Sequence, residues 1–182
     1  MSLEDEYRDE PEVTQWQGRF IAAKTRGRWE YVSRARGIKA AVILAFTPED
    51  EVVLVEQFRI PLGRPCIELP AGLIGDDDGG EDEDAATAAI RELEEETGYH
   101  AARMENLGEF YSSPGMVSEA FTLFRAYDLT RVGAGGGVEG EGITVHHVPR
   151  AGIAEFIAAR RAEGYGIDVR LLMLLSPAWL RA

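Results

Sequence analysis

The chain has 182 residues, of which 45% are apolar and 28% are charged, a composition typical of a single globular domain. Its net charge of -13 argues against nucleic acid and anionic membranes as partners, because both bind basic surfaces. The single cysteine, Cys66, excludes a disulfide within the chain. The sequence does not start with a basic segment followed by an apolar one, and no run reaches about 18 apolar residues, so we expect a cytoplasmic protein.

The N-terminal third of the chain divides into segments of different composition. Residues 1–12 are rich in acidic side chains, and we expect them to be disordered. Residues 14–23 and 28–34 have strand-like sequence, which predicts an antiparallel β region over residues 13–36. A lone two-stranded ribbon is only marginally stable, so this region should pack on another surface. The main domain is expected over residues 37–182.

Strand-like and helix-like stretches alternate along the main domain. Residues 38–46 and 52–58 are apolar and flank a turn-forming stretch, which predicts a buried hairpin. Residues 59–73 hold three prolines and two glycines, which predicts an irregular crossing with at most short strands. After a central helix we expect strands at residues 103–111 and 120–129, a mobile glycine-rich loop at residues 133–142 and a short strand at residues 143–148. Two helices should follow at residues 151–162 and 168–175. This order indicates an α/β layered domain.

Residues 84–97 form the clearest predicted helix. Four apolar residues recur at helical spacing, and Gly98 follows where a C-terminal cap belongs; the four are Ala86, Ala89, Ile90 and Leu93. Because each helical residue advances about 100°, Glu92, Glu95 and Glu96 fall within one arc beside the apolar stripe. Such crowded carboxylates suit either a solvated acidic face or a hard divalent cation. Arg91 precedes Glu95 by four residues and is its predicted partner.

The order of residues around these glutamates resembles the Nudix box. Glu83, seven further residues and then Arg91-Glu92-Leu93-Glu94-Glu95-Glu96-Thr97-Gly98-Tyr99 agree with the pattern of that family. One position departs: the family's glycine corresponds to Gly72, with extra residues inserted in the acidic stretch 75–82. The resemblance implies a Nudix-type α/β/α sandwich with a mixed sheet, and Mg²⁺ as cofactor with Mn²⁺ as an alternative. It also implies that Glu92 and Glu96 bind the metal, with Glu95 close by.

Three stretches resemble the ADP-ribose pyrophosphatase branch of this family. Glu56-Gln57-Phe58-Arg59, with Glu68-Leu69-Pro70-Ala71-Gly72-Leu73, matches the run before the box, which implies that the Ala71 carbonyl is a metal ligand and that Arg59 contacts phosphate. Pro114, with Glu119 shortly after it, stands where the branch has a marker proline in its substrate site. Glu139-Gly140-Glu141 lies where the branch places a catalytic glutamate in a flexible loop, and either glutamate could be the base.

A fourth resemblance concerns residues 28–34, which look like the segment that dimers of this branch exchange. It implies a homodimer in which Trp29 stacks on adenine with Arg34 nearby. The alternative is that Trp29 is a core residue, as tryptophans on strands often are.

The sequence thus predicts a Mg²⁺-dependent enzyme that cuts the pyrophosphate bond of ADP-ribose or a related ADP-sugar into AMP and a sugar phosphate. The expected partners are a small nucleotide sugar and a second copy of the chain. The residues expected to act in catalysis are Glu139 or Glu141, Glu95 and Arg91. Two alternatives remain: a pyrophosphatase for another nucleoside diphosphate sugar, such as GDP-mannose or ADP-glucose, and an ADP-ribose sensor without catalytic activity.

Overall fold

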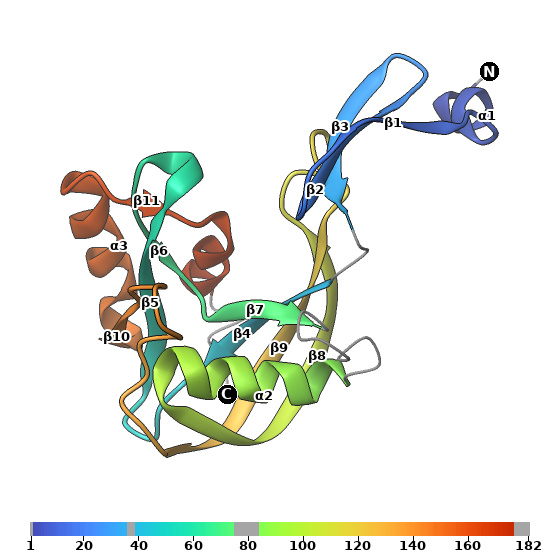
Figure 1. Ribbon diagram of the computed structural model, residues 1–182. Helices are drawn as coiled ribbons and strands as arrows, with labels where there is room; N and C mark the ends of the chain where they lie inside the picture. The colour runs from blue at the N-terminus through green and yellow to red at the C-terminus, as the bar shows by residue number, and fades with distance from the viewer. Residues whose placement is uncertain (1, 36–38, 75–83, 177–182) are drawn as a thin grey trace.

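The computed structural model describes residues 2–35, 39–74 and 84–176 (Figure 1). Its N-terminal part is a short helix, α1 (Leu3–Tyr7), followed by an antiparallel sheet of β1 (Glu12–Gln17), β2 (Ile21–Arg26) and β3 (Trp29–Arg34). The first of the two predicted strands is therefore two strands, because the Gly18 N–H donates to the Ile21 carbonyl at 2.9 Å and closes a turn. This sheet projects from the main body of the molecule.

The segment expected to be disordered at the N-terminus includes α1. A reciprocal cap explains how so short a helix starts: the Ser2 side chain accepts a hydrogen bond from the Asp5 N–H, and the Asp5 carboxylate accepts one from the Ser2 N–H. None of the residues within α1 is buried.

The main body contains two four-stranded sheets. The first has the order β7–β4–β9–β8, from β4 (Lys39–Ala45), β7 (Ala71–Ile74), β8 (Tyr99–Tyr111) and β9 (Ala120–Arg131). It is mixed, because β4 and β9 are parallel while the other pairs are antiparallel. The second has the order β10–β5–β6–β11, from β5 (Glu51–Arg59), β6 (Arg64–Glu68), β10 (Thr144–Pro149) and β11 (Gly166–Ile167).

The predicted hairpin of β4 and β5 is wrong. A bridge between Phe46 and Val52 joins the two strands at the turn, after which β4 enters the first sheet and β5 the second. The physical reason is that both strands are buried on both faces: Val42 and Ile43 on β4 and Leu54 on β5 are all 0% exposed. Such continuous apolar runs fit the interior of a sheet without specifying the neighbouring strand.

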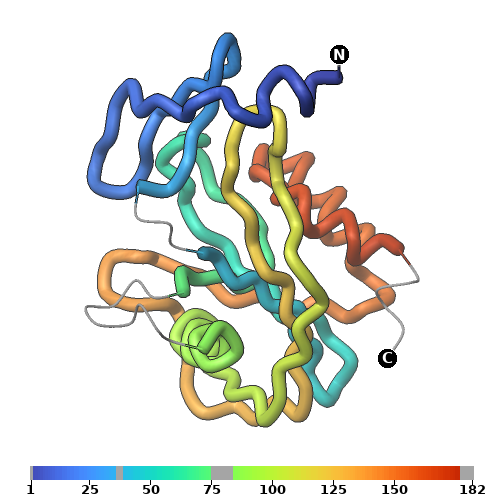
Figure 2. Tube along the Cα trace, turned by 90° about the vertical axis from the view of Figure 1, so that its right-hand side faces the viewer, coloured from blue at the N-terminus to red at the C-terminus, as the bar shows by residue number. Residues whose placement is uncertain are grey.

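Helices cover the sheets on opposite sides (Figures 1 and 2). On one side α2 (Ala85–Thr97) packs Ala89 and Leu93 against Ile43 of β4. The other side carries α3 (Ile153–Ala162). The described residues also contain three 3₁₀ segments: η1 (Ile60–Leu62), η2 (Arg150–Gly152) and η3 (Val169–Leu175). The helix predicted over residues 168–175 is present as the 3₁₀ helix η3. The α/β/α layering with a mixed sheet is confirmed, and in the described ranges no helix has the length and apolar character to span a bilayer.

Candidate active site

The helix α2 presents its glutamates in two directions. Gly98 ends the helix with φ 74°, as predicted, and at the other end the Asp84 side chain caps the helix by accepting a hydrogen bond from the Thr87 N–H. Glu92 and Glu96 line a cleft of about 860 Å³. Glu95, on the outer part of the same arc, is exposed and pairs with Arg91 at 3.5 Å. Arg91 also pairs with Glu92 at 3.0 Å.

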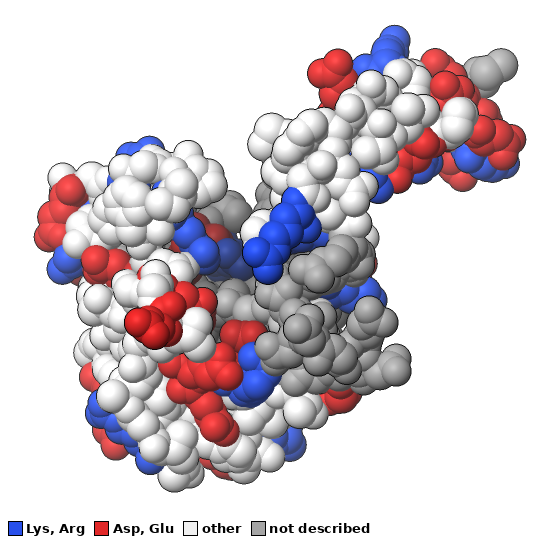
Figure 3. Space-filling model, viewed as in Figure 1, with Lys and Arg blue, Asp and Glu red and all other residues white. Residues whose placement is uncertain are grey.

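The cleft lies where the two sheets of the main body separate. Glu68 at the end of β6 and Ala71 at the start of β7 both line it, so the chain crosses from one sheet to the other within the wall of the cleft. In the space-filling view, acidic side chains gather over α2 beside a hollow that holds basic side chains (Figure 3). The cleft is thus bounded by both signs of charge, as a site for a metal-bound phosphate requires.

Glu96 is the more buried of the two cleft carboxylates, with 8% of its surface exposed. It accepts a hydrogen bond of 3.0 Å from the Ala71 N–H, but burial dominates and raises the pKa of its carboxyl to about 8. Burial also raises the pKa of Glu92, and the charge of Glu141 acts on both groups in the same direction. Ionisation of these two carboxyl groups is therefore unfavourable, because the hydrogen bonds of the site do not compensate for their burial.

Gly72 on β7 is required by the position of Glu92. A Cβ atom at residue 72 would stand 1.9 Å from Cδ of Glu92, far closer than any real contact. The structure thus gives a physical reason for the glycine that the sequence comparison placed here. The box residue Glu83 and the insertion 75–82 lie outside the described residues.

The oxygen ligands that a divalent cation could use are the carboxylates of Glu92 and Glu96 and the main-chain carbonyl of Ala71. Within residues 2–35, 39–74 and 84–176, no three His, Cys, Asp or Glu side chains converge closely enough to form a metal site by themselves. Mg²⁺, however, is commonly bound by one or two carboxylates and completed by water and substrate phosphates. The raised pKa values of Glu92 and Glu96 mark the charge that a cation would neutralise, so these residues fit a hard divalent metal.

The glycine-rich loop is tied to the end of α2. The Gly136 N–H donates to the Glu96 carbonyl at 2.8 Å and the Gly137 N–H to the Glu95 carbonyl at 3.0 Å, which satisfies acceptors that a helix end leaves open. The tip then returns to the cleft, where Glu141 is one of the lining residues and Glu139, which is exposed, is not. The Glu141 carboxylate accepts a hydrogen bond of 2.9 Å from the Val138 N–H.

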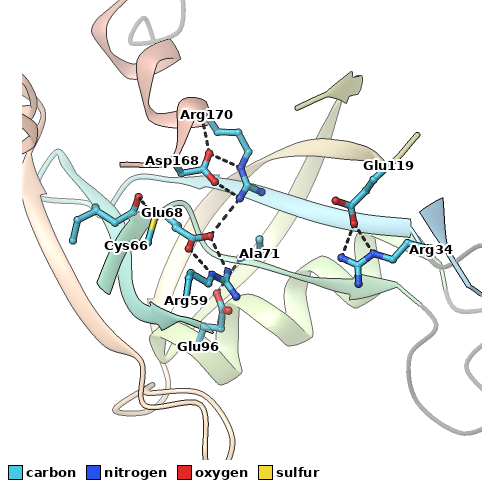
Figure 4. Close-up of polar contacts among 10 residues, drawn as sticks. Arg34, Arg59, Cys66, Glu68, Ala71, Glu96, Glu119, Asp168 and Arg170 are labelled. Carbon is cyan, nitrogen blue, oxygen red and sulfur yellow. Dashed lines mark hydrogen bonds and ion pairs between the residues drawn. The ribbon is translucent and has the colours of Figure 1, made fainter. Parts of the chain in front are cut away.

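Two arginines face the cleft on either side of Ala71 (Figure 4). Arg59 on β5 donates to both oxygens of Glu68, at 2.5 and 2.8 Å. Arg34 at the end of β3 donates to Glu119 at 2.5 Å. The structure thus brings together most of the residues expected to bind substrate or metal: Arg34, Arg59, Ala71, Glu92, Glu96, Glu119 and Glu141.

The comparison with known proteins identifies the family of the chain. The model of the NUDIX domain matches residues 36–148, more than half of the chain. This chain belongs to the Nudix family. A solved structure, a crystal structure of an ADP compounds hydrolase, has a TM-score of 0.68 and 21% identity and covers 93% of this chain and 91% of its own, which shows the same fold.

Curated relatives of this Nudix protein include an ADP-ribose pyrophosphatase and a GDP-mannose pyrophosphatase. The ADP-ribose pyrophosphatase of Bacillus subtilis (strain 168) is 42% identical over 91 residues, which are 50% of this chain and 46% of that protein. The match thus spans about half the length of that relative. The GDP-mannose pyrophosphatase of Cronobacter sakazakii (strain ATCC BAA-894) is 36% identical over 154 residues, 80% of this chain and 75% of that protein.

Trp29 and Pro114 lie outside the Nudix cleft of their own chain. They line a separate, mainly apolar pocket of about 590 Å³ between the N-terminal sheet and residues 114–118. Trp29 begins β3 and Arg34 ends it, so the two are roughly 16 Å apart along the strand. The sequence had grouped these residues as one substrate site, whereas the structure divides them between two hollows.

Three charged residues of the cleft were missing from the sequence-based site: Glu68, Asp168 and Arg170. Glu68 belongs to the run before the Nudix box and could have been found there. Asp168 and Arg170 lie about 100 residues further along, in a segment read only as a helix. No local sequence pattern marks these two residues as part of a site. They lie beside Glu68 because β11 pairs with β6 in the fold.

Proposed function

We propose that this Nudix protein uses Mg²⁺ to hydrolyse the pyrophosphate bond of a nucleoside diphosphate sugar, with ADP-ribose as the first candidate and AMP and ribose 5-phosphate as products. One observation carries the proposal: the partly buried carboxylate of Glu92 and the buried one of Glu96 share a cleft with Arg59 and Arg34. Such a cleft suits a substrate with a central metal-bound diphosphate. The names of the relatives supply the nucleotide-sugar class.

The side chains divide the work of phosphate hydrolysis. A bound Mg²⁺ would neutralise the diphosphate and orient a water, and Glu92, Glu96 and the Ala71 carbonyl would hold it. The N–H groups of Arg59 that do not bind Glu68 would hold a phosphate oxygen. Glu141 would accept the proton of the attacking water as the base, and Arg91 would fix the carboxylates of α2.

A panel of substrates tests the proposal. With Mg²⁺, we expect kcat/KM to rank ADP-ribose above ADP-glucose, GDP-mannose and a nucleoside triphosphate, with released mononucleotide as the readout. Mn²⁺ should replace Mg²⁺. A triphosphate as the best substrate would contradict the nucleotide-sugar assignment, and binding of ADP-ribose without any cleavage would indicate a sensor.

GDP-mannose is the second candidate substrate, because the relative matched over 80% of this chain carries that name. The same panel separates the two candidates. A kcat/KM for GDP-mannose above that for both ADP-sugars would move the assignment to it.

We infer that the protein acts as a homodimer through its N-terminal sheet. Large apolar side chains on this sheet are 44–58% exposed, which favours a protein interface; they are Val13, Trp16, Phe20, Ile21 and Trp29. A second subunit would also explain how Trp29, distant from the cleft of its own chain, could stack on a base.

Light scattering and one substitution test the dimer. We expect the mass of two chains, and Trp29→Ala should raise KM for ADP-ribose by about 5- to 150-fold with little change in kcat, since stacking is equal in ground and transition states. Leu172→Ala, also at an exposed apolar side chain but on η3, should leave KM unchanged. A fully active monomer would contradict this inference.

A further inference from the structure

Glu68 is a buried carboxylate held by arginines from two distant parts of the chain. It is 3% exposed at the end of β6. Arg59 donates to both of its oxygens, and Arg170 Nη2 lies 3.4 Å from Oε2. Figure 4 shows the two guanidinium groups approaching Glu68 from different sides. A buried charge needs such partners, because an unpaired one is costly.

Arg170 is itself held in place from several sides. Asp168 accepts hydrogen bonds from its Nε and its backbone N–H, both at 2.7 Å. The guanidinium carbon lies 5.5 Å from the ring centre of Phe121. The Asp168 N–H donates to the Ile67 carbonyl at 3.0 Å, which fixes the pair directly beside Glu68. Arg170 therefore reaches Glu68 from a rigid support.

The charges of this cluster are balanced. Burial acts to raise the pKa of Asp168, but hydrogen bonds and the charge of Arg170 outweigh it and lower that pKa, so the pair stays ionised. Two carboxylates, Glu68 and Asp168, then face two guanidinium groups, Arg59 and Arg170. The cluster as a whole adds no net charge to the cleft.

The hydrogen bonds to Glu68 leave some N–H groups of the Arg59 guanidinium free. An arginine has five N–H donors, and two of those of Arg59 bind Glu68. Its side chain is 41% exposed and lines the cleft together with Glu96. The donors that remain are therefore directed by the orientation of Glu68.

We propose that Asp168 and Arg170 are a positioning pair, which fixes Glu68 so that Arg59 presents its free N–H groups to the diphosphate of the substrate. The role of the diphosphate rests on the proposed function. Both residues follow residue 148, where the match to the NUDIX domain ends, so the C-terminal segment becomes part of the site. Neither residue needs to touch the substrate.

A double-mutant cycle tests the positioning, with binding of inorganic pyrophosphate in the presence of Mg²⁺ measured by calorimetry. Arg59→Met should weaken binding on the order of 10- to 100-fold, as expected for lost charge-assisted hydrogen bonds. Arg170→Met should weaken it about 3- to 30-fold. If Arg170 acts through Arg59, the double variant should bind no more weakly than Arg59→Met alone. Arg161→Met, which removes an exposed charge on α3, should bind like the wild type.

Two further variants separate positioning from charge and from folding. Arg170→Lys keeps the charge but has no planar fork to serve both carboxylates, so it should bind more weakly than the wild type. Asp168→Asn keeps an oxygen for the Arg170 N–H and so preserves the start of η3, yet it should show a smaller loss that also disappears in the Arg59→Met background. This variant decides the question if Arg170→Met unfolds.

The outcomes distinguish this proposal from the proposed function. Additive losses in the cycle, or full binding by Arg170→Lys, would overturn the positioning role and leave only a charge effect. If the wild type hydrolyses no nucleotide sugar while the pyrophosphate cycle is non-additive, the function fails and the positioning stands. If ADP-ribose is hydrolysed and Arg170→Met matches the wild type in binding and KM, the proposed function stands and the positioning role fails.

Discussion

Replacing Glu96 by glutamine should stabilise the metal-free protein at alkaline pH while lowering turnover by about a hundredfold or more. An amide can still accept the hydrogen bond of the Ala71 N–H, but it cannot replace an anionic metal ligand. The carboxylate that we propose as a metal ligand is therefore one whose ionised form destabilises the fold. Its removal should separate the stability of this protein from its activity.

The magnitude follows from the pKa of Glu96. Burial raises it from 4.5 to about 8, so between these values the folded state binds more protons than the unfolded chain. The free energy of unfolding should accordingly fall as pH rises, by about 3 kcal/mol between pH 5 and pH 8 from this group. Burial of Glu92 acts in the same direction. At pH 8 we expect Glu96→Gln to gain about 2–3 kcal/mol, or about 4–12 °C in melting temperature.

Urea unfolding in EDTA at pH 5, 6, 7 and 8 measures this effect. The fall with pH should be shallower in Glu96→Gln than in the wild type, and added Mg²⁺ should stabilise the wild type much more than the variant. Glu155→Gln removes an exposed charge on α3 and should leave the slope unchanged. Equal slopes for wild type and Glu96→Gln would refute the reasoning, and so would a variant that is less stable at pH 8.

Two further predictions concern the neighbours of this carboxylate. Glu141→Gln should lower kcat by about a hundredfold or more without affecting stability, whereas Glu139→Gln should retain nearly full activity, because only the former lines the cleft; the opposite result in steady-state kinetics would move the base to Glu139. Gly72→Ala should displace Glu92 and cost about a hundredfold in kcat with a raised requirement for Mg²⁺. Gly115→Ala, where an added Cβ meets open space, is its control, and equal activity of the two would show that the close approach has no role.

Local features of the sequence predicted α2 well. Its apolar spacing and the Gly98 cap are both encoded within one short segment, and the structure follows them. The division of the glutamates could not be predicted in the same way. An arc of about 100° contains Glu92, Glu95 and Glu96, but the position of β7 decides that Glu96 is buried and Glu95 is exposed.

Features that depend on strand pairing could not be predicted from the sequence. The runs of β4 and β5 are apolar on every residue that faces the core, so they indicated strands without indicating partners. The pair Asp168 and Arg170 reaches Glu68 across about 100 residues of chain. A site residue of this kind becomes visible only when the fold places β11 against β6.

The short crossing between β6 and β7 limits how the molecule can move. Only two residues separate Glu68 from Ala71, both of which line the cleft, and the Ile43 N–H donates to the Pro70 carbonyl at 2.8 Å. Hydrogen bonds from the Ile43 N–H of β4 and to the Glu96 side chain of α2 brace this crossing, which leaves it little freedom to act as a hinge between the two sheets. We therefore expect the exposed segment around Glu141, at the edge of the cleft, to control the entry of substrate and the exit of products. The charged groups around the crossing should keep their spacing through each turnover.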